Sequence, residues 1–194
     1  MKTLVVNLFA GPGAGKTTCA WEIASELKKR NINTEYVPEY AKELVWDENH
    51  EALADQEHIF EVQANRINRL IGKVDVIVTD SPVLFSEIYG QNNSENFRKR
   101  IWNEHDNHYN FNLFINRGTS FQQQGRLHNL EESKVIDAKI KNMLESNAVY
   151  YGQYYHRTVP VIIDNIEKTL HRIQNETENT VDAEYEEQDE ESEL

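Results

Sequence analysis

Cysteine is nearly absent from this chain of 194 residues, and long apolar runs are missing. The single Cys19 excludes an internal disulfide framework and a metal site made of several thiolates, and it fits a reducing compartment. No stretch approaches the roughly 18 apolar residues of a membrane span, and the apolar start, residues 1–9, is too short for a signal peptide. We therefore expect a soluble, cytoplasmic protein that does not engage a membrane.

Lysine and arginine are missing from residues 176–193, which contain ten of the 33 acidic residues of the chain. This segment has too few apolar residues to offset the entropy of ordering it, so residues 175–194 are predicted to form an acidic, disordered tail. The other 23 acidic residues nearly balance the 20 basic ones. The formal net charge of -13 therefore does not exclude an anionic partner for residues 1–174, which are long enough for one folded domain.

Short β-rich runs alternate with helical patterns along residues 1–174, which predicts an α/β fold with a parallel sheet between helices. Strands are expected at residues 3–9, 34–37, 74–79, 112–115 and 159–163. Helices are expected at 16–30, within 59–70, at 131–144 and at 165–174. The first strand leads through a glycine turn directly into the first helix, which is the layout of the P-loop fold.

The glycine turn reads Ala-Gly-Pro-Gly-Ala-Gly-Lys-Thr-Thr from residue 10, a P-loop pattern with alanine at the first glycine position. Its glycines let backbone N–H groups surround phosphate oxygens at the positive end of the helix. The nucleotide-binding residues that the pattern predicts are Gly11, Pro12, Gly13, Ala14, Gly15, Lys16, Thr17 and Thr18. Lys16 is expected to reach the terminal phosphates of ATP, and the Thr17 hydroxyl is expected to ligate Mg²⁺. The alternative is a glycine turn that only connects a strand to a helix. The full P-loop pattern, placed between a predicted strand and a predicted helix, disfavours this alternative.

Two carboxylates follow predicted strands. Asp80 ends the apolar run 76–79, at the edge of the sheet where α/β proteins bind ligands, so it is the predicted magnesium-side carboxylate. An aspartate that caps the turn before Ser81 is the alternative. Glu39 follows the second strand and is a candidate general base for an acceptor hydroxyl. A solvated glutamate in a helix first turn explains Glu39 equally well.

A polar, glycine-bounded loop at residues 116–126 contains Arg117 and Arg126. Phosphoryl transfer is catalysed mainly by positioning and by positive charge, so a loop that closes with an arginine suits this chemistry. The loop is therefore a predicted lid, with Arg126 as its catalytic arginine. A surface loop with solvated arginines is the alternative.

Four elements together resemble the ribosylnicotinamide-kinase-like group of P-loop ATPases and kinases. They are the P-loop, Pro38-Glu39-Tyr40, Thr79-Asp80-Ser81-Pro82 and the Gly125-Arg126 lid, and the resemblance spans most of residues 1–174. It implies a three-layer sandwich around a five-stranded parallel sheet, with the P-loop strand beside the Asp80 strand, an ATP donor and a hydroxyl acceptor. Glu39 is similar in position to the catalytic glutamate of deoxynucleoside kinases. The lid has Gln124-Gly125 where ribosylnicotinamide kinases usually have Asp-Gly, so a nicotinamide substrate is not implied.

The chain looks most like bacteriophage members of that group, and in size and layout it is similar to phage kinases that phosphorylate 5-hydroxymethyluracil in DNA. This resemblance implies a kinase in the host cytoplasm that flips a base into its pocket and binds the backbone along a positive path. Residues 98–100 and Arg117 are the candidates for that path.

Three hypotheses about function stay open at this point. The specific hypothesis that the sequence favours is a kinase that phosphorylates 5-hydroxymethyluracil in phage DNA. The alternatives are a kinase for a free nucleoside or nucleotide and a nucleotide-binding ATPase or regulator without a small acceptor. Nothing in the pattern predicts an oligomeric state.

Overall fold

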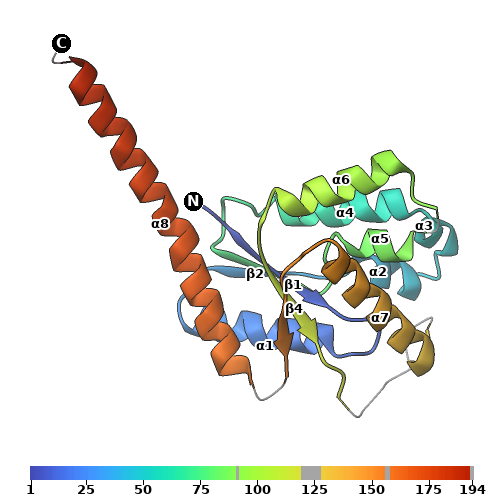
Figure 1. Cartoon of the computed structure of the whole chain (residues 1–194). Coiled ribbons are helices and arrows are strands. Elements are labelled where there is room, and N and C mark those ends of the chain that lie inside the picture. Colours follow the sequence, from blue (N-terminus) through green and yellow to red (C-terminus); the bar gives the residue numbers. More distant parts are fainter. Residues whose placement is uncertain (91, 119–127, 156–157, 193–194) are drawn as a thin grey trace.

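A five-stranded parallel sheet lies between two layers of helices in the computed structural model (Figure 1). The structure describes residues 1–90, 92–118, 128–155 and 158–192, with side chains up to residue 176. The strand order of the sheet is β2-β3-β1-β4-β5. This confirms the predicted α/β fold with an all-parallel sheet of five strands.

The register of the sheet places the P-loop strand in its centre. The strands are β1 (Leu4–Phe9), β2 (Thr34–Val37), β3 (Val76–Thr79), β4 (Tyr109–Ile115) and β5 (Gly152–Tyr154). Leu4 of β1 lies opposite Val76 of β3 on one side and Tyr109 of β4 on the other. Since β2 pairs with the far side of β3, strands β1 and β3 flank a topological switch point. Their carboxyl ends are where ligands bind in such sheets.

Helices cover both faces of the sheet. They are α1 (Lys16–Lys29), α2 (Tyr40–Trp46), α3 (His50–Ala54), α4 (Gln56–Asn68), α5 (Phe85–Tyr89), α6 (Glu95–Asp106), α7 (Leu130–Ser146) and α8 (Val159–Ser192). Helices α1 and α8 pack on one face, and α4 to α7 pack on the other (Figure 1). The sequence patterns did not predict α5 and α6.

Apart from Asn7, strand β1 is apolar on both faces because both faces are covered. Leu4, Val6 and Leu8 belong to the core beneath α1 and α8. Val5 and Phe9 belong to the core beneath α4 to α7. Two separate cores therefore fix the strand that ends at the P-loop.

The predicted strand at residues 159–163 is wrong, because these residues begin α8. The fifth strand is the short β5, which pairs with β4 from Gly152 opposite Leu113. The β-branched run misled the prediction, but its apolar residues continue at helical spacing and are buried against α1 and the sheet. They are Val159, Ile162, Ile163, Ile166, Leu170 and Ile173. Pro160 is compatible with this helix because it lies in the first turn, where a missing N–H costs nothing.

The acidic segment continues α8 as far as Ser192, and Figure 1 shows this helix extending away from the sheet. The backbone of residues 175–192 is thus helical, where composition predicts disorder. The predicted boundary at residue 174 and the disorder of the tail stay predictions. Among the described residues, no helix is long and apolar enough to cross a membrane.

Candidate functional site

Three segments that carry predicted site residues leave neighbouring strands at the same edge of the sheet. The P-loop follows β1, Glu39 follows β2 with one residue between them, and Asp80 follows β3 directly. Because the strands are parallel, their carboxyl ends meet, and the three segments come together around one cavity. The β1–β3 neighbourhood that the family resemblance implied is also present.

The P-loop has the backbone conformation that its glycines permit. Gly13 and Gly15 have φ values of 74° and 94°, in the left-handed region that disfavours other residues. Gly15 is the N-cap of α1, and its side-chain position is open, so the backbone conformation and not lack of space requires glycine here. The first turn of α1 contains no acidic residue. Its unneutralised N-terminus is therefore suited to bind an anion.

Thr17 and Asp80 form a pair of oxygen ligands beside the P-loop. The Thr17 hydroxyl donates to Asp80 Oδ2 at 2.5 Å. Asp80 is buried, and its Oδ1 has no hydrogen-bond partner among the described residues. A buried carboxylate oxygen without a partner is costly, and hydroxyl and carboxylate oxygens are ligands that Mg²⁺ prefers. The residues present therefore fit a magnesium ion at this position.

Lys16 is held between the P-loop and the opposite wall of the cavity. Its Nζ lies 3.5 Å from the Gly11 carbonyl oxygen and 5.3 Å from the ring centroid of Phe85. Burial lowers the pKa of Lys16, while the nearby carboxylates of Glu39 and Asp80 raise it. A bound polyphosphate would add negative charge around this ammonium group and favour its charged form.

Glu39 occupies the N-cap position of α2, but its side chain makes no capping hydrogen bond. It lines the cavity instead, and its carboxylate lies close enough to Lys16 to affect the pKa of the lysine. Glu39 thus lies both at the N-terminus of α2, as the helix-dipole alternative expects, and at the cavity, so its role as a general base stays a prediction.

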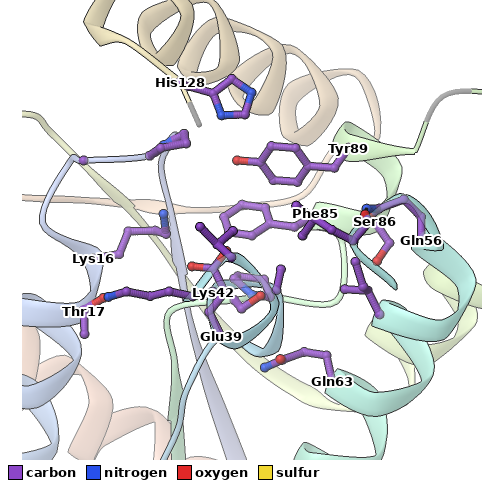
Figure 2. A pocket seen from close by; sticks show the side chains of 18 of the residues that line it. Lys16, Thr17, Glu39, Lys42, Gln56, Gln63, Phe85, Ser86, Tyr89 and His128 are labelled. Atoms are coloured by element: carbon purple, nitrogen blue, oxygen red, sulfur yellow. The ribbon is translucent and has the colours of Figure 1, made fainter. Parts of the chain in front are cut away.

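The cavity has a volume of about 780 Å³, within the range of small-molecule sites. Figure 2 shows Lys16 and Thr17 on one side, Phe85 and Ser86 on the other, and Glu39 between them. The wall away from the P-loop includes residues that sequence reasoning did not identify. They are Trp46, His50, Gln56, Ile59, Gln63, Tyr89 and His128. They come from several helices with no motif in common, so only the assembled fold brings them together.

Gln63 shows how the far wall is fixed. Its side chain is buried on α4, and Oε1 accepts from the backbone N–H of Tyr40 at 3.1 Å. Its Nε2 lies 3.5 Å from Thr79 Oγ1 at the end of β3. Gln63 therefore ties α4 to the segment after β2 and fixes the backbone that follows Glu39.

Two tryptophans at the cavity are unusually accessible. Trp21 on α1 is 60% exposed, Trp46 on α2 is 64% exposed, and both line the cavity. Exposed tryptophans at a ligand site are suited to stack on a planar ring.

The two predicted lid arginines have different outcomes. Arg126 lies outside the described residues, so its catalytic role stays a prediction. Arg117 packs against the P-loop, where its Nη1 donates to the Pro12 carbonyl oxygen at 2.7 Å and its Nε pairs with Asp137 on α7. Asp137 has no sequence motif, and the prediction missed it.

The cations proposed for a DNA path are engaged with carboxylates. Arg98 pairs with Glu87 at 3.4 Å, and Lys99 pairs with Glu95 at 2.7 Å. Arg100 contacts two glutamates of α4, at 3.1 and 2.7 Å. These ion pairs reduce the positive charge that α6 can offer to a nucleic-acid backbone.

A model of the family described as "AAA domain" matches residues 5–167 of the chain. No curated protein sequence matches this chain.

Three solved structures share the fold. Deoxyadenosine kinase from M. mycoides, with products dCMP and a flexible dCDP bound, has a TM-score of 0.56 and 16% identity, over 87% of this chain and 99% of that one. Thymidylate kinase from Ehrlichia chaffeensis has a TM-score of 0.53 and 13% identity, over 88% and 100%. Kti12 from Chaetomium thermophilum in complex with ADP-AlF3 has a TM-score of 0.51 and 12% identity, over 86% and 98%. At such identities the likeness shows the fold alone.

Proposed function

The chain belongs to the AAA-domain family, and from that premise we propose that it is an ATP-dependent phosphotransferase whose acceptor is a hydroxyl of a nucleoside-type molecule. One observation carries the proposal. Lys16 and Thr17 of the P-loop and Glu39 line one cavity, Asp80 is bonded to Thr17 beside it, and the far wall offers aromatic and neutral polar side chains. An ATPase also needs a carboxylate, to activate water, so it is the far wall rather than Glu39 that favours an acceptor other than water.

The donor side of the mechanism uses the P-loop and α1. Backbone N–H groups of residues 13–18 bind the β- and γ-phosphates of ATP, and Lys16 holds the γ-phosphate as a point charge. Thr17 Oγ1 and Asp80 would hold Mg²⁺, which, when bound, neutralises phosphate charge as it develops. Since catalysis of this reaction is largely positioning and electrostatics, these groups supply most of what the donor needs.

The acceptor side uses Glu39. Its carboxylate accepts the proton of the acceptor hydroxyl while the hydroxyl oxygen bonds to the γ-phosphorus. The bond from the γ-phosphorus to the bridging oxygen breaks, and ADP leaves with the electron pair.

The acceptor class follows from the chemistry of the wall. Trp46, Phe85 and Tyr89 offer aromatic surface, and the amide of Gln56 and the hydroxyl of Ser86 are neutral polar groups. A nucleoside presents an aromatic base with polar edges and a primary hydroxyl, so it matches this wall. The fold shared with a deoxyadenosine kinase and a thymidylate kinase adds support by analogy.

A base in DNA, such as 5-hydroxymethyluracil, is the other acceptor that the sequence suggested. The ion pairs on α6 disfavour it, because Arg98, Lys99 and Arg100 would have to leave their carboxylates to bind phosphates. We therefore place the free nucleoside first and the DNA base second.

The proposal is tested by transfer of label from γ-labelled ATP, with magnesium, to free nucleosides, nucleoside monophosphates and DNA that contains 5-hydroxymethyluracil. Label on a free nucleoside supports the proposal. Label on DNA alone replaces the preferred acceptor with the second one. Release of free phosphate alone, over an acceptor panel that includes all common nucleosides, contradicts a phosphotransferase and favours an ATPase.

A further inference from the structure

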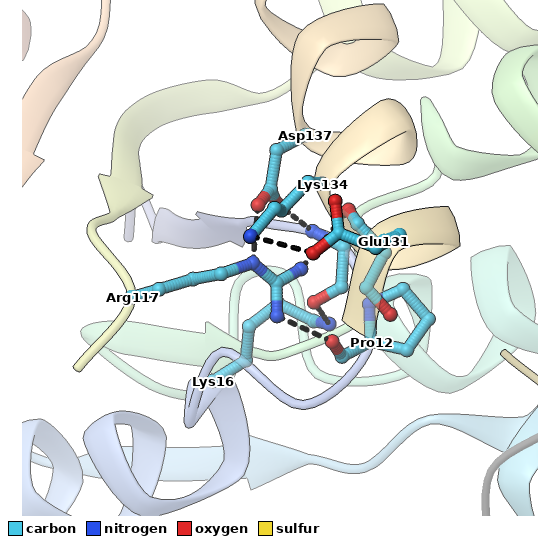
Figure 3. A network of polar contacts seen from close by, with 8 residues as sticks. Pro12, Lys16, Arg117, Glu131, Lys134 and Asp137 are labelled. Atoms are coloured by element: carbon cyan, nitrogen blue, oxygen red, sulfur yellow. Dashed lines mark hydrogen bonds and ion pairs between the residues drawn. The ribbon is translucent and has the colours of Figure 1, made fainter. Parts of the chain in front are cut away.

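Arg117 makes three contacts that join the end of β4 to the P-loop and α7. Its Nη1 donates to the Pro12 carbonyl oxygen at 2.7 Å, and its Nη2 donates to the Ser133 carbonyl oxygen at 3.1 Å. Its Nε forms an ion pair with Asp137 Oδ2, and Figure 3 shows the guanidinium between the P-loop and α7. The side chains of Arg117 and Asp137 are only 14% and 16% exposed, so the pair is largely shielded from water.

Asp137 binds the P-loop directly as well. Its Oδ1 accepts from the backbone N–H of Gly11 at 2.6 Å. The approach of α7 is so close that a Cβ on Gly11 would lie 2.5 Å from the Ser133 carbonyl oxygen and 2.8 Å from Arg117 Nη2. Gly11 is therefore required by the packing of α7 rather than by an unusual backbone angle.

We propose that Arg117 and Asp137 form a charge-balanced clamp that positions the first half of the P-loop and sets its affinity for the polyphosphate of ATP. Both residues act through the loop, so they are positioning residues. The clamp also connects the P-loop to the chain just after β4 and to α7, since Arg117 lies two residues after β4 and Asp137 lies within α7. The inference builds on the donor half of the proposed function and does not depend on the acceptor.

Charge balance matters because the clamp lies within electrostatic reach of Lys16. Arg117 lowers the pKa of Lys16 and Asp137 raises it, so the two charges oppose each other at this ammonium group. Removal of Arg117 alone would leave an uncompensated carboxylate beside the phosphate site, which would repel ATP. Removal of the Asp137 charge alone would leave a cation there, which would attract ATP. A role confined to stability would weaken binding in both cases.

The test is calorimetric binding of magnesium-ATP without any acceptor, with Arg117→Gln, Asp137→Asn and the double variant. We expect Arg117→Gln to raise the Kd about tenfold, as a single charge near the surface can do. Asp137→Asn keeps an oxygen for Gly11 N–H, and its Kd is expected to equal or fall below that of the unmodified protein. The double variant restores charge balance, and its Kd is expected to return to within about threefold.

Two controls separate charge from folding. Arg117→Lys keeps the charge without the planar fork, and its Kd is expected to lie between those of the unmodified protein and Arg117→Gln. Arg30→Gln removes an arginine that also pairs with two carboxylates, at 2.7 Å each, but at the other end of α1, and it should leave the Kd unchanged. Thermal unfolding without nucleotide identifies any variant that does not fold.

Equal weakening by Arg117→Gln and Asp137→Asn, with no recovery in the double variant, would overturn the charge-balanced clamp. Kd values within threefold of that of the unmodified protein for all three variants would also overturn it. Because the readout is ATP binding alone, these outcomes are distinct from failure of the proposed function, in which ATP binds but no acceptor is phosphorylated.

Discussion

At the donor end of the cavity, polar groups are bound to one another within a few residues of the strand ends, whereas the acceptor wall consists of aromatic and amide side chains from several helices. Thr17 bonds to Asp80, and Asp137 bonds to the P-loop backbone. On the acceptor wall, Trp46 is largely exposed, and Tyr89 packs edge-on against Phe85, at 5.9 Å between ring centroids, and lies beside the ring of His128. The donor end is thus fixed by hydrogen bonds that involve the P-loop, whereas exposed members of the acceptor wall such as Trp46 can change in sequence without disturbing it.

The largest effect is expected at the donor end, from Lys16→Ala. Transfer of the γ-phosphate should fall about 10⁴-fold, because the charge that stabilises the transferred group is lost. The rate of transfer to the best acceptor measures this, and thermal unfolding shows whether the fold persists. A rate within tenfold of that of the unmodified protein would remove Lys16 from the mechanism.

Glu39→Gln tests the role of Glu39, which lies between the donor end and the acceptor wall. If Glu39 is the general base, kcat should fall about 10²- to 10³-fold while the Kd for ATP stays within twofold. Steady-state kinetics and calorimetry together separate the two quantities. If the affinity for ATP fell by the same factor as kcat, Glu39 would act at the donor end instead. Undiminished transfer would show that Glu39 is not the general base.

The same contrast explains what could be predicted from the sequence. The first strand, the helix after the glycine turn and the position of Asp80 at the end of β3 agree with the prediction, because a local pattern of glycines and apolar residues specifies them. The acceptor wall was not, because Trp46, Gln63 and Tyr89 have no common spacing. Asp137 gave no signal either, since its partners lie about 20 and 126 residues away along the chain.

The last strand was mispredicted for another physical reason. The run from Val159 has the β-branched residues of a strand and the spacing of a helix, and a short window shows only the first property. Packing on α1 decided the outcome, since Ile166 and Leu170 continue the stripe over two further turns. A longer window that included them would have predicted α8.

Trp46→Ala sharpens the comparison on the acceptor wall. Loss of a stacking surface should raise the acceptor KM about tenfold, while the Kd for ATP stays constant. Tyr150→Ala is the matched control, because Tyr150 is also exposed but does not line the cavity. An unchanged acceptor KM in the tryptophan variant would exclude stacking at Trp46.

The smallest effect is expected at Cys19, which lies one turn into α1 behind the P-loop. Burial raises the pKa of its thiol to about 11, so at about pH 8 the thiol is protonated and unreactive. The folded protein should therefore show no reaction with a thiol reagent on a timescale in which the denatured protein reacts completely. Rapid labelling of the folded protein would show that the core under the donor end opens readily.

The most direct test of the account measures ADP formation and acceptor phosphorylation in the same reaction, with and without a nucleoside. If the donor end and the acceptor wall form one active site, ADP formation should be slow alone, accelerate when the nucleoside is added and match the phosphorylated product one to one. ADP formation that is unaffected by every nucleoside, with no phosphorylated product, would contradict the assignment of the cavity to phosphoryl transfer.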